Sequence, residues 1–149
     1  MSKKKISANS DWRSGSANIN IRAMRLEHFA LQVPDPVAMA DWYVKHLGCQ
    51  IARSFGAPAH GRFLTVGGTL FEIYNNPSAS VPDYHAIPPL HLHLAFSSEN
   101  LAADRDRLVK AGARVVEDVS TTPSGDEIMM LRDPWHLPIQ FVKRKEAMI

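Results

Sequence analysis

The chain contains the same pattern twice, and this internal repeat restricts its fold more than any other feature of the sequence. In the first copy a histidine precedes a glycine by 20 residues, from His28 to Gly48. In the second copy His93 precedes Gly112 by 19 residues. Each glycine is followed by a short apolar stretch. Both copies therefore predict a strand, a helix that ends at a glycine, and another strand.

The repeat extends to the ends of the two copies. The separation between His28 and Glu72 is 44 residues, and that between His93 and Gln140 is 47. Apolar residues flank Glu72 and Gln140 in the same way. These matches predict two βαβββ modules, the first at about 24–77 and the second at about 89–144. Modules of roughly 60 residues bury too little surface to be stable alone, so we expect them to pair.

In the first module the spacing of apolar residues changes from that of a strand to that of a helix. Residues alternate from Leu26 to Val33, which predicts a strand. Asp35 can cap a helix that has Pro36 at its first position, and apolar residues then recur at three- and four-residue steps up to Gly48. The remaining strands of this module are expected at 49–55, 62–66 and 69–75, with a Gly67-Gly68 hairpin turn between the last two.

The second module repeats this order after a proline-rich link at 77–89. A strand is predicted from Leu90 to Phe96 and a helix from about Asn100 to Ala111. Further strands are expected near 113–119, 127–131 and 138–143, with a turn at Asp133-Pro134 before the last one. The predicted fold class is α+β, with two tandem modules that form a cupped mixed sheet and carry their helices on its outer face.

The net charge of +2 is unevenly distributed. Residues 1–23 contain five Lys or Arg and one Asp, a net charge of +4, so residues 24–149 have a net charge of −2. Residues 1–23 show no periodicity and are predicted to be a flexible basic extension. The mildly acidic remainder is predicted to form a single domain at 24–144, without the basic surface that nucleic acid binding requires.

Cysteine content and apolar runs exclude further classes of protein. Cys49 is the single cysteine, so the chain has no internal disulfide and no multi-cysteine zinc site. A reducing, cytoplasmic setting is expected. The apolar runs are far shorter than the roughly 20 residues of a membrane span, and we expect no membrane association.

Four polar residues occupy equivalent positions in the two modules. Alternation places them on the sheet face opposite the apolar residues that meet the helices. Two imidazoles, one carboxylate and one carboxamide suit a divalent metal such as Zn, Ni, Co, Mn or Fe. The alternative is that each is a half-exposed strand residue. The four residues are His28, Glu72, His93 and Gln140.

Three further residues are candidates for the same pocket. His91 shares a face with His93 and is either an alternative ligand or, as we favour, a residue that lines the pocket. Tyr74 and Met130 are expected either to line the cup or to pack in the ordinary way.

Several segments resemble the vicinal oxygen chelate superfamily, which contains the glyoxalase, bleomycin-resistance and extradiol dioxygenase proteins. The resemblance covers about residues 24–144. Its most specific parts are a histidine on a strand before an amphipathic helix, and an Asp-Pro turn before the last strand. The segments are LEHFALQVPDPVAMADWYVKHLG, LFEIYNNP, HLAFSSENLAADRDRLVKAGARV and LRDPWHLPIQFVKR.

The resemblance implies that the four residues named above are the metal ligands. Metal-dependent members commonly have Glu where this chain has Gln140, although glyoxalase I and methylmalonyl-CoA epimerases mix Gln and Glu. The expected function is therefore a glyoxalase I-like lyase or isomerase that acts on a small oxo or hydroxy-carbonyl substrate through an enediolate. Glu72, the only carboxylate among the ligands, is the expected base.

Two other functions stay open. The leading alternative is a metal-free, small-molecule binding protein of the bleomycin-resistance type. An extradiol-type dioxygenase is less consistent with Gln140, because that chemistry uses a glutamate there. We expect a homodimer, since the link at 77–89 permits the modules to pair within one chain or between two.

Overall fold

The computed structural model describes residues 24–148, so the predicted flexible extension at 1–23 lies outside the described residues. Each module contains one helix and four strands in the predicted order. The elements are β1 (Phe29–Gln32), α1 (Pro36–Leu47), β2 (Gln50–Ser54), β3 (Arg62–Val66), β4 (Thr69–Tyr74), β5 (Leu94–Ser97), α2 (Leu101–Lys110), β6 (Arg114–Thr121), β7 (Glu127–Arg132) and β8 (Pro138–Lys143).

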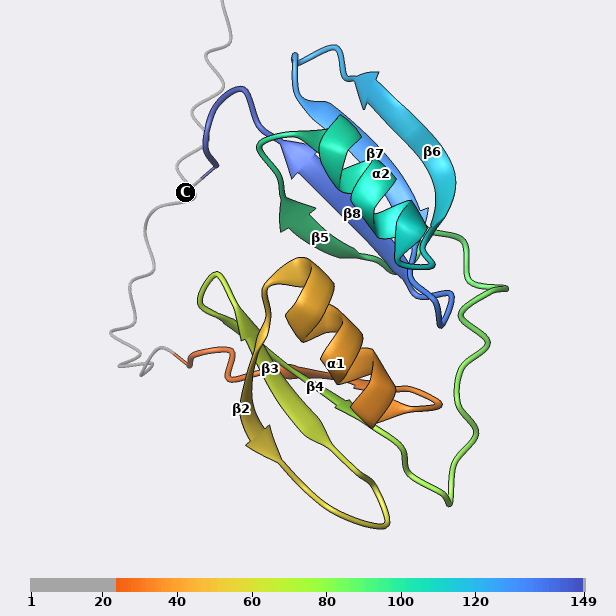
Figure 1. The fold of residues 1–149 in the computed structure, drawn as a ribbon. Coiled ribbons are helices and arrows are strands. Elements are labelled where there is room, and N and C mark those ends of the chain that lie inside the picture. Colours follow the sequence, from red (N-terminus) through yellow and green to blue (C-terminus); the bar gives the residue numbers. More distant parts are fainter. Residues whose placement is uncertain (1–23, 149) are drawn as a thin grey trace, which may run out of the picture.

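The strands form two four-stranded mixed sheets with the same topology. The strand order is β1-β4-β3-β2 in the first sheet and β5-β8-β7-β6 in the second. The first strand of each module pairs in parallel with the last, and the other pairs are antiparallel. Figure 1 shows the two sheets side by side with both helices on the same side. The α+β fold class and the two tandem βαβββ modules are therefore confirmed.

Helix α1 begins and ends as its sequence predicts. The Asp35 carboxylate accepts a hydrogen bond of 3.0 Å from the backbone N–H of Ala38, and Pro36 occupies the first position. Gly48 ends the helix in a left-handed conformation with φ of 70°, which costs a glycine little. Met39, Ala40 and Tyr43 form the buried face of the helix.

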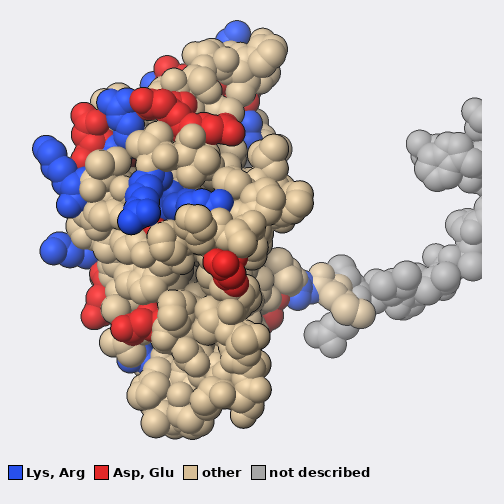
Figure 2. Space-filling model, turned by 90° about the vertical axis from the view of Figure 1, so that its right-hand side faces the viewer, with Lys and Arg blue, Asp and Glu red and all other residues tan. Residues whose placement is uncertain are grey.

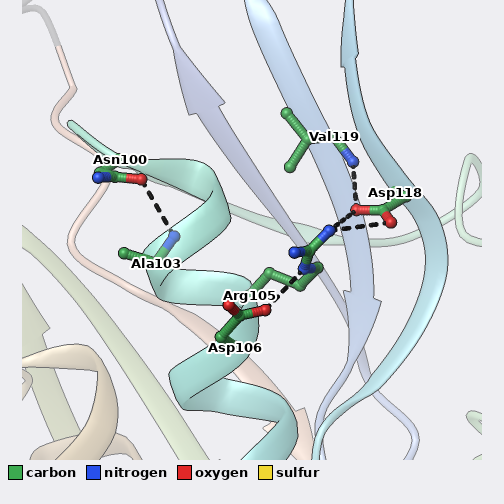
Figure 3. A network of polar contacts seen from close by, with 6 residues as sticks. All are labelled: Asn100, Ala103, Arg105, Asp106, Asp118 and Val119. Carbon is green, nitrogen blue, oxygen red and sulfur yellow. Dashed lines mark hydrogen bonds and ion pairs between the residues drawn. The ribbon is translucent and has the colours of Figure 1, made fainter.

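Helix α2 is fixed at its N-terminus and along one side (Figure 3). The side chain of Asn100 caps the helix through the N–H of Ala103, at 3.0 Å. The Arg105 guanidinium donates to both carboxylate oxygens of Asp118 on β6, at 2.8 and 3.0 Å. These contacts fix the orientation of α2 against the edge of its own sheet.

The first strand of each module is shorter than predicted. β1 begins at Phe29 rather than Leu26, and no strand covers Met24 and Leu26, whose exposed fractions are 95% and 85%. β5 begins at Leu94 rather than Leu90. Two prolines precede that segment and have no backbone N–H to donate, and the N–H of His91 is used in a turn to Pro88 O. His28 and His93 therefore lie directly before their strands, not within them.

The two modules share one hydrophobic core, which contains residues from both helices and both sheets. The helices also contact one another through polar groups. Trp42 Nε1 donates to Ala111 O at 2.8 Å, and Arg107 Nη1 donates to His46 O at 2.6 Å. The two modules therefore pack against one another and are joined along the two helix C-termini.

The link between the modules is attached to both of them. Arg132 on β7 donates to Tyr84 O at 2.6 Å and to Ile87 O at 2.8 Å. The Tyr84 hydroxyl in turn donates to Gln32 O on β1, at 2.8 Å. The partly buried Arg132 guanidinium thus satisfies backbone carbonyls of the link, and these hydrogen bonds hold the link in a defined path between the two modules.

The two modules differ in surface charge. Figure 2 shows charged side chains of both signs over its upper half, where the second module lies, and a largely uncharged surface below. Within residues 24–148, no helix has the length and apolar character needed to cross a membrane.

Candidate functional site

His28 and Glu72 come together on the face of the first sheet that α1 does not cover. The His28 Nε2 and Glu72 Oε2 atoms are 3.7 Å apart, with side chains 32% and 21% exposed. Phe63 is paired in register with Glu72 across the β3–β4 ladder. Its ring packs edge-on against the His28 imidazole, with 5.1 Å between ring centres. The structure thus brings these two polar residues of the repeat close together.

His28 is held through one ring nitrogen. Its Nδ1 atom is hydrogen-bonded to the carboxylate of the adjacent Glu27, and its Nε2 atom faces Glu72 Oε2. Two ligands of one ion lie about 3 Å apart, which is close to the observed separation. The donor chemistry of this pair fits a divalent cation.

His93 has the same arrangement in the second module. Its Nδ1–H donates to Pro89 O at 2.8 Å, which leaves Nε2 free. Metal-binding histidines usually donate their other N–H to a carbonyl or carboxylate in this way. Gln140 is half-buried on β8, in register with Ala95 on one side and Met130 on the other.

The structure brings the first pair of the four expected ligands together. Within residues 24–148, no three His, Cys, Asp or Glu side chains lie close enough to hold one metal ion. His93 therefore does not join His28 and Glu72 in this structure. The four-residue metal site stays a prediction. The Nδ1 atoms of both histidines are engaged in hydrogen bonds, which leaves their Nε2 atoms as the available ligand atoms.

A cavity separates the free edges of the two sheets. This seam cavity has a volume of about 1020 Å³. Five consecutive residues at the free edge of β5, from His93 to Ser97, line one side of it. Phenylalanines from both modules add an apolar lining, and two of the pairs stack at 5.6 Å: Phe29 with Phe71, and Phe96 with Phe141.

The three further pocket candidates have different surroundings. Tyr74 is half-buried on the same face of β4 as Glu72. Met130 is 2% exposed and lies in register beside Gln140. His91 is exposed and belongs to the turn before β5 rather than to a strand. Their roles in a pocket stay predictions.

Sequence reasoning missed the residues that surround the Glu72 carboxylate. Phe63 was not identified, although its alternation with the buried Leu64 places it on the open face of β3. The loop 55–61 was also missed. A side chain at Gly61 would lie against Glu72, and only the three-dimensional path of this loop reveals that proximity.

This fold and this pair of residues define a protein built from paired βαβββ modules with polar side chains on an open sheet face. Residues 25–141 match the family model of the Glyoxalase/Bleomycin resistance protein/Dioxygenase superfamily. The chain belongs to this superfamily, as its sequence motifs predict.

Known relatives agree with this assignment. An ethylmalonyl-CoA/methylmalonyl-CoA epimerase from Cereibacter sphaeroides is 34% identical over 100 residues, which are 62% of this chain and 74% of the relative. Two solved structures show the same fold. A glyoxalase/bleomycin resistance protein/dioxygenase family enzyme from Burkholderia phytofirmans PsJN has a TM-score of 0.65 at 17% identity, covering 78% of this chain and 95% of the other. A glyoxalase I variant from Zea mays has a TM-score of 0.66 at 18% identity, covering 82% of this chain and 46% of the other.

Proposed function

We propose that this protein is a metal-dependent isomerase or lyase that moves a proton at a carbon next to a carbonyl group. The observation that carries the proposal is the His28–Glu72 pair, in which the His28 Nε2 atom faces a carboxylate oxygen at 3.7 Å. The 34% identity to an acyl-CoA epimerase supports isomerisation. His28, Glu72, His93 and Gln140 would hold the metal.

The residues of the chain supply the proton transfer and the orientation of the substrate. A bound divalent metal would polarise the substrate oxygens and make the adjacent C–H more acidic. The Glu72 carboxylate accepts the proton from that carbon and delivers it to the neighbouring carbon. Phe63 keeps the His28 ring in place by edge-on packing. The Gln140 carboxamide donates a hydrogen bond to a substrate oxygen.

We infer a small α-carboxy thioester or a thiol hemithioacetal as substrate. The thioester places a carboxylate oxygen and a thioester carbonyl oxygen beside its acidic carbon. The hemithioacetal places a hydroxyl and a ketone oxygen there. The epimerase relative, by its name, acts on alkylmalonyl-CoA thioesters. The uncharged aromatic surroundings of Glu72 suit an alkyl group on the reacting carbon.

Proton exchange tests this function directly. The protein is loaded separately with Zn, Ni, Co, Mn or Fe(II) and incubated in D₂O with 2-methylmalonyl-CoA or with the methylglyoxal–glutathione hemithioacetal. We expect one of the two to incorporate deuterium or be isomerised. No exchange with either substrate and any metal would overturn the proposal.

Metal content provides the second test. Protein purified without added metal is compared with His28→Ala and His93→Ala, and His91→Ala serves as the matched control. We expect bound metal in the wild type and in His91→Ala, and a loss of about tenfold or more in affinity in the other two variants. Uptake that is equal in all four proteins would contradict the ligand assignment.

A small-molecule binding protein without metal is the second candidate. The seam cavity favours it, because phenylalanines line a volume of about 1020 Å³ and small-molecule sites are mostly apolar. Under this alternative the wild type takes up no metal on titration. An aromatic probe such as 8-anilinonaphthalene-1-sulfonate would then bind, and Phe96→Ala would weaken its binding.

A further inference from the structure

We infer that Gly61 is a positioning residue for the Glu72 carboxylate, an inference that rests on the proposed function of Glu72. Gly61 is buried at the end of the loop 55–61, directly before β3. A Cβ atom at this position would lie 3.4 Å from Glu72 Oε1 and 3.3 Å from the Phe55 ring. A methyl group at this position would therefore be in contact with one carboxylate oxygen of Glu72.

The carboxylate is thus confined on two sides. Oε2 faces the His28 imidazole at 3.7 Å, and Oε1 lies 3.4 Å from the place that a Cβ atom at residue 61 would take. A methyl group there would make a close contact of 3.3 Å with the Phe55 ring and a contact with Oε1 at the short end of the ordinary van der Waals range. Since the end of a glutamate side chain is flexible, its carboxylate would turn relative to His28.

The loop itself is held by several hydrogen bonds. Arg62 Nη1 donates to three of its carbonyls, those of Phe55, His60 and Gly61, at 3.0 to 3.1 Å. The Phe55 N–H donates to Gly61 O at 2.8 Å, and a further bond of 2.9 Å joins Asn75 N–H to Ala59 O. We therefore expect the ends of the Phe55 and Glu72 side chains, rather than the loop, to accommodate an added methyl group.

Gly56 in the same loop offers a matched control. Neither Gly56 nor Gly61 has a positive φ, so alanine is compatible with the backbone at both positions. A Cβ atom at Gly56 would have no atom within 4 Å. Gly56→Ala and Gly61→Ala thus make the same chemical change in one loop, and only the second touches Glu72.

The experiment compares both variants with the wild type by two readouts. The first is the ¹³C resonance of the Glu72 side-chain carboxyl in metal-free protein, assigned by its loss in Glu72→Gln. The second is kcat and KM for proton exchange. We expect Gly61→Ala to shift the resonance and to lower kcat by about tenfold or more, since small misplacements of reacting groups are costly. KM should stay within about threefold, and Gly56→Ala should match the wild type.

An unchanged Glu72 resonance in Gly61→Ala, or an equal change in Gly56→Ala, would overturn the inference. If the wild type shows neither proton exchange nor metal uptake, the proposed function fails, and the resonance alone still decides the role of Gly61. If Gly61→Ala does not fold, the double variant Phe55→Ala/Gly61→Ala removes the ring contact and keeps the carboxylate contact, with Phe55→Ala as its reference.

Discussion

The Tyr43 hydroxyl on α1 donates a hydrogen bond of 2.8 Å to Asp133 Oδ2 in the turn between β7 and β8. Tyr43 is fully buried and Asp133 is 1% exposed, so the bond joins the helix of the first module to the second module inside the shared core. The other oxygen of Asp133 accepts the N–H groups of Trp135 and Leu137, both at 2.9 Å. One carboxylate therefore shapes the turn and links the modules.

Tyr43→Phe should destabilise the protein without changing its fold. The substitution keeps the ring and removes the bond that Tyr43 makes with Asp133 Oδ2. Leaving a buried acceptor unpaired costs about 1–3 kcal/mol. Urea unfolding at pH 7 measures the loss, and Tyr74→Phe is the control because its hydroxyl makes no such bond among residues 24–148. A loss of equal size in both variants would contradict this account.

Folding stability should fall as the pH rises from about 4 to about 6. Burial raises the pKa of Asp133 from 3.8 to about 6, against the opposing effect of its three hydrogen bonds. The folded state therefore binds a proton that the unfolded state releases. The stabilisation is complete below the pKa that Asp133 has in the unfolded state. It is lost as the pH rises through the pKa that Asp133 has in the folded state, and the loss amounts to up to about 3 kcal/mol. Urea midpoints measured between pH 4 and pH 7 test this.

Asp133→Asn isolates that contribution. The amide cannot ionise, so the decline in stability between pH 4 and pH 6 should become shallower than in the wild type. The Tyr43 hydrogen bond favours the charged carboxylate, and its removal in Tyr43→Phe should raise the pKa of Asp133 further. An identical pH profile in wild type and Asp133→Asn would show that other groups cause the decline.

Glu72→Gln should abolish turnover and keep much of the bound metal. The carboxamide retains an oxygen ligand of similar shape but cannot accept a proton from carbon. We expect kcat to fall by at least about a hundredfold, the lower end of general base contributions. Metal content and proton exchange are measured on the same sample. Full activity in this variant would refute the assignment of Glu72 as the base.

Cys49 should be unreactive in the folded protein. The side chain is 3% exposed, and burial raises the pKa of its thiol to about 11. Since the thiolate is the nucleophile, both effects slow alkylation. Iodoacetamide at pH 8 should modify the protein at a rate close to its unfolding rate, and much faster in urea. Rapid modification under native conditions would disprove the buried placement.

The repeat was sufficient to predict the fold, because the spacing of its glycines and the alternation of its strands are local signals. The cap at Asp35, the turn at Gly67-Gly68 and the order of the strands all follow from residues near to one another in sequence. The predictions that the first strand of each module begins at Leu26 and at Leu90 were wrong, because β1 begins at Phe29 and β5 at Leu94. Alternation shows which face a residue prefers, but a strand also needs a neighbour with free backbone groups.

The site was less predictable than the fold. His28 lies near Glu72 because it directly precedes β1, which pairs with β4 in the sheet. The position of His93 depends on how the two modules meet, and nothing in a single strand encodes that. The contact between Gly61 and Glu72 depends on the path of a loop. The metal, the substrate and the homodimer stay predictions.

The two hairpin turns that face the opposite module's helix differ in size. The first is the two-residue Gly67-Gly68 turn, with φ of 54° and 79°, at the rim of the seam cavity. The corresponding turn in the second module runs from Asp133 to Leu137 and packs into the core. The two modules thus differ at this corner, where the shorter turn borders the seam cavity and the longer turn packs into the core. A hybrid built from two copies of the second half should therefore lack the seam cavity.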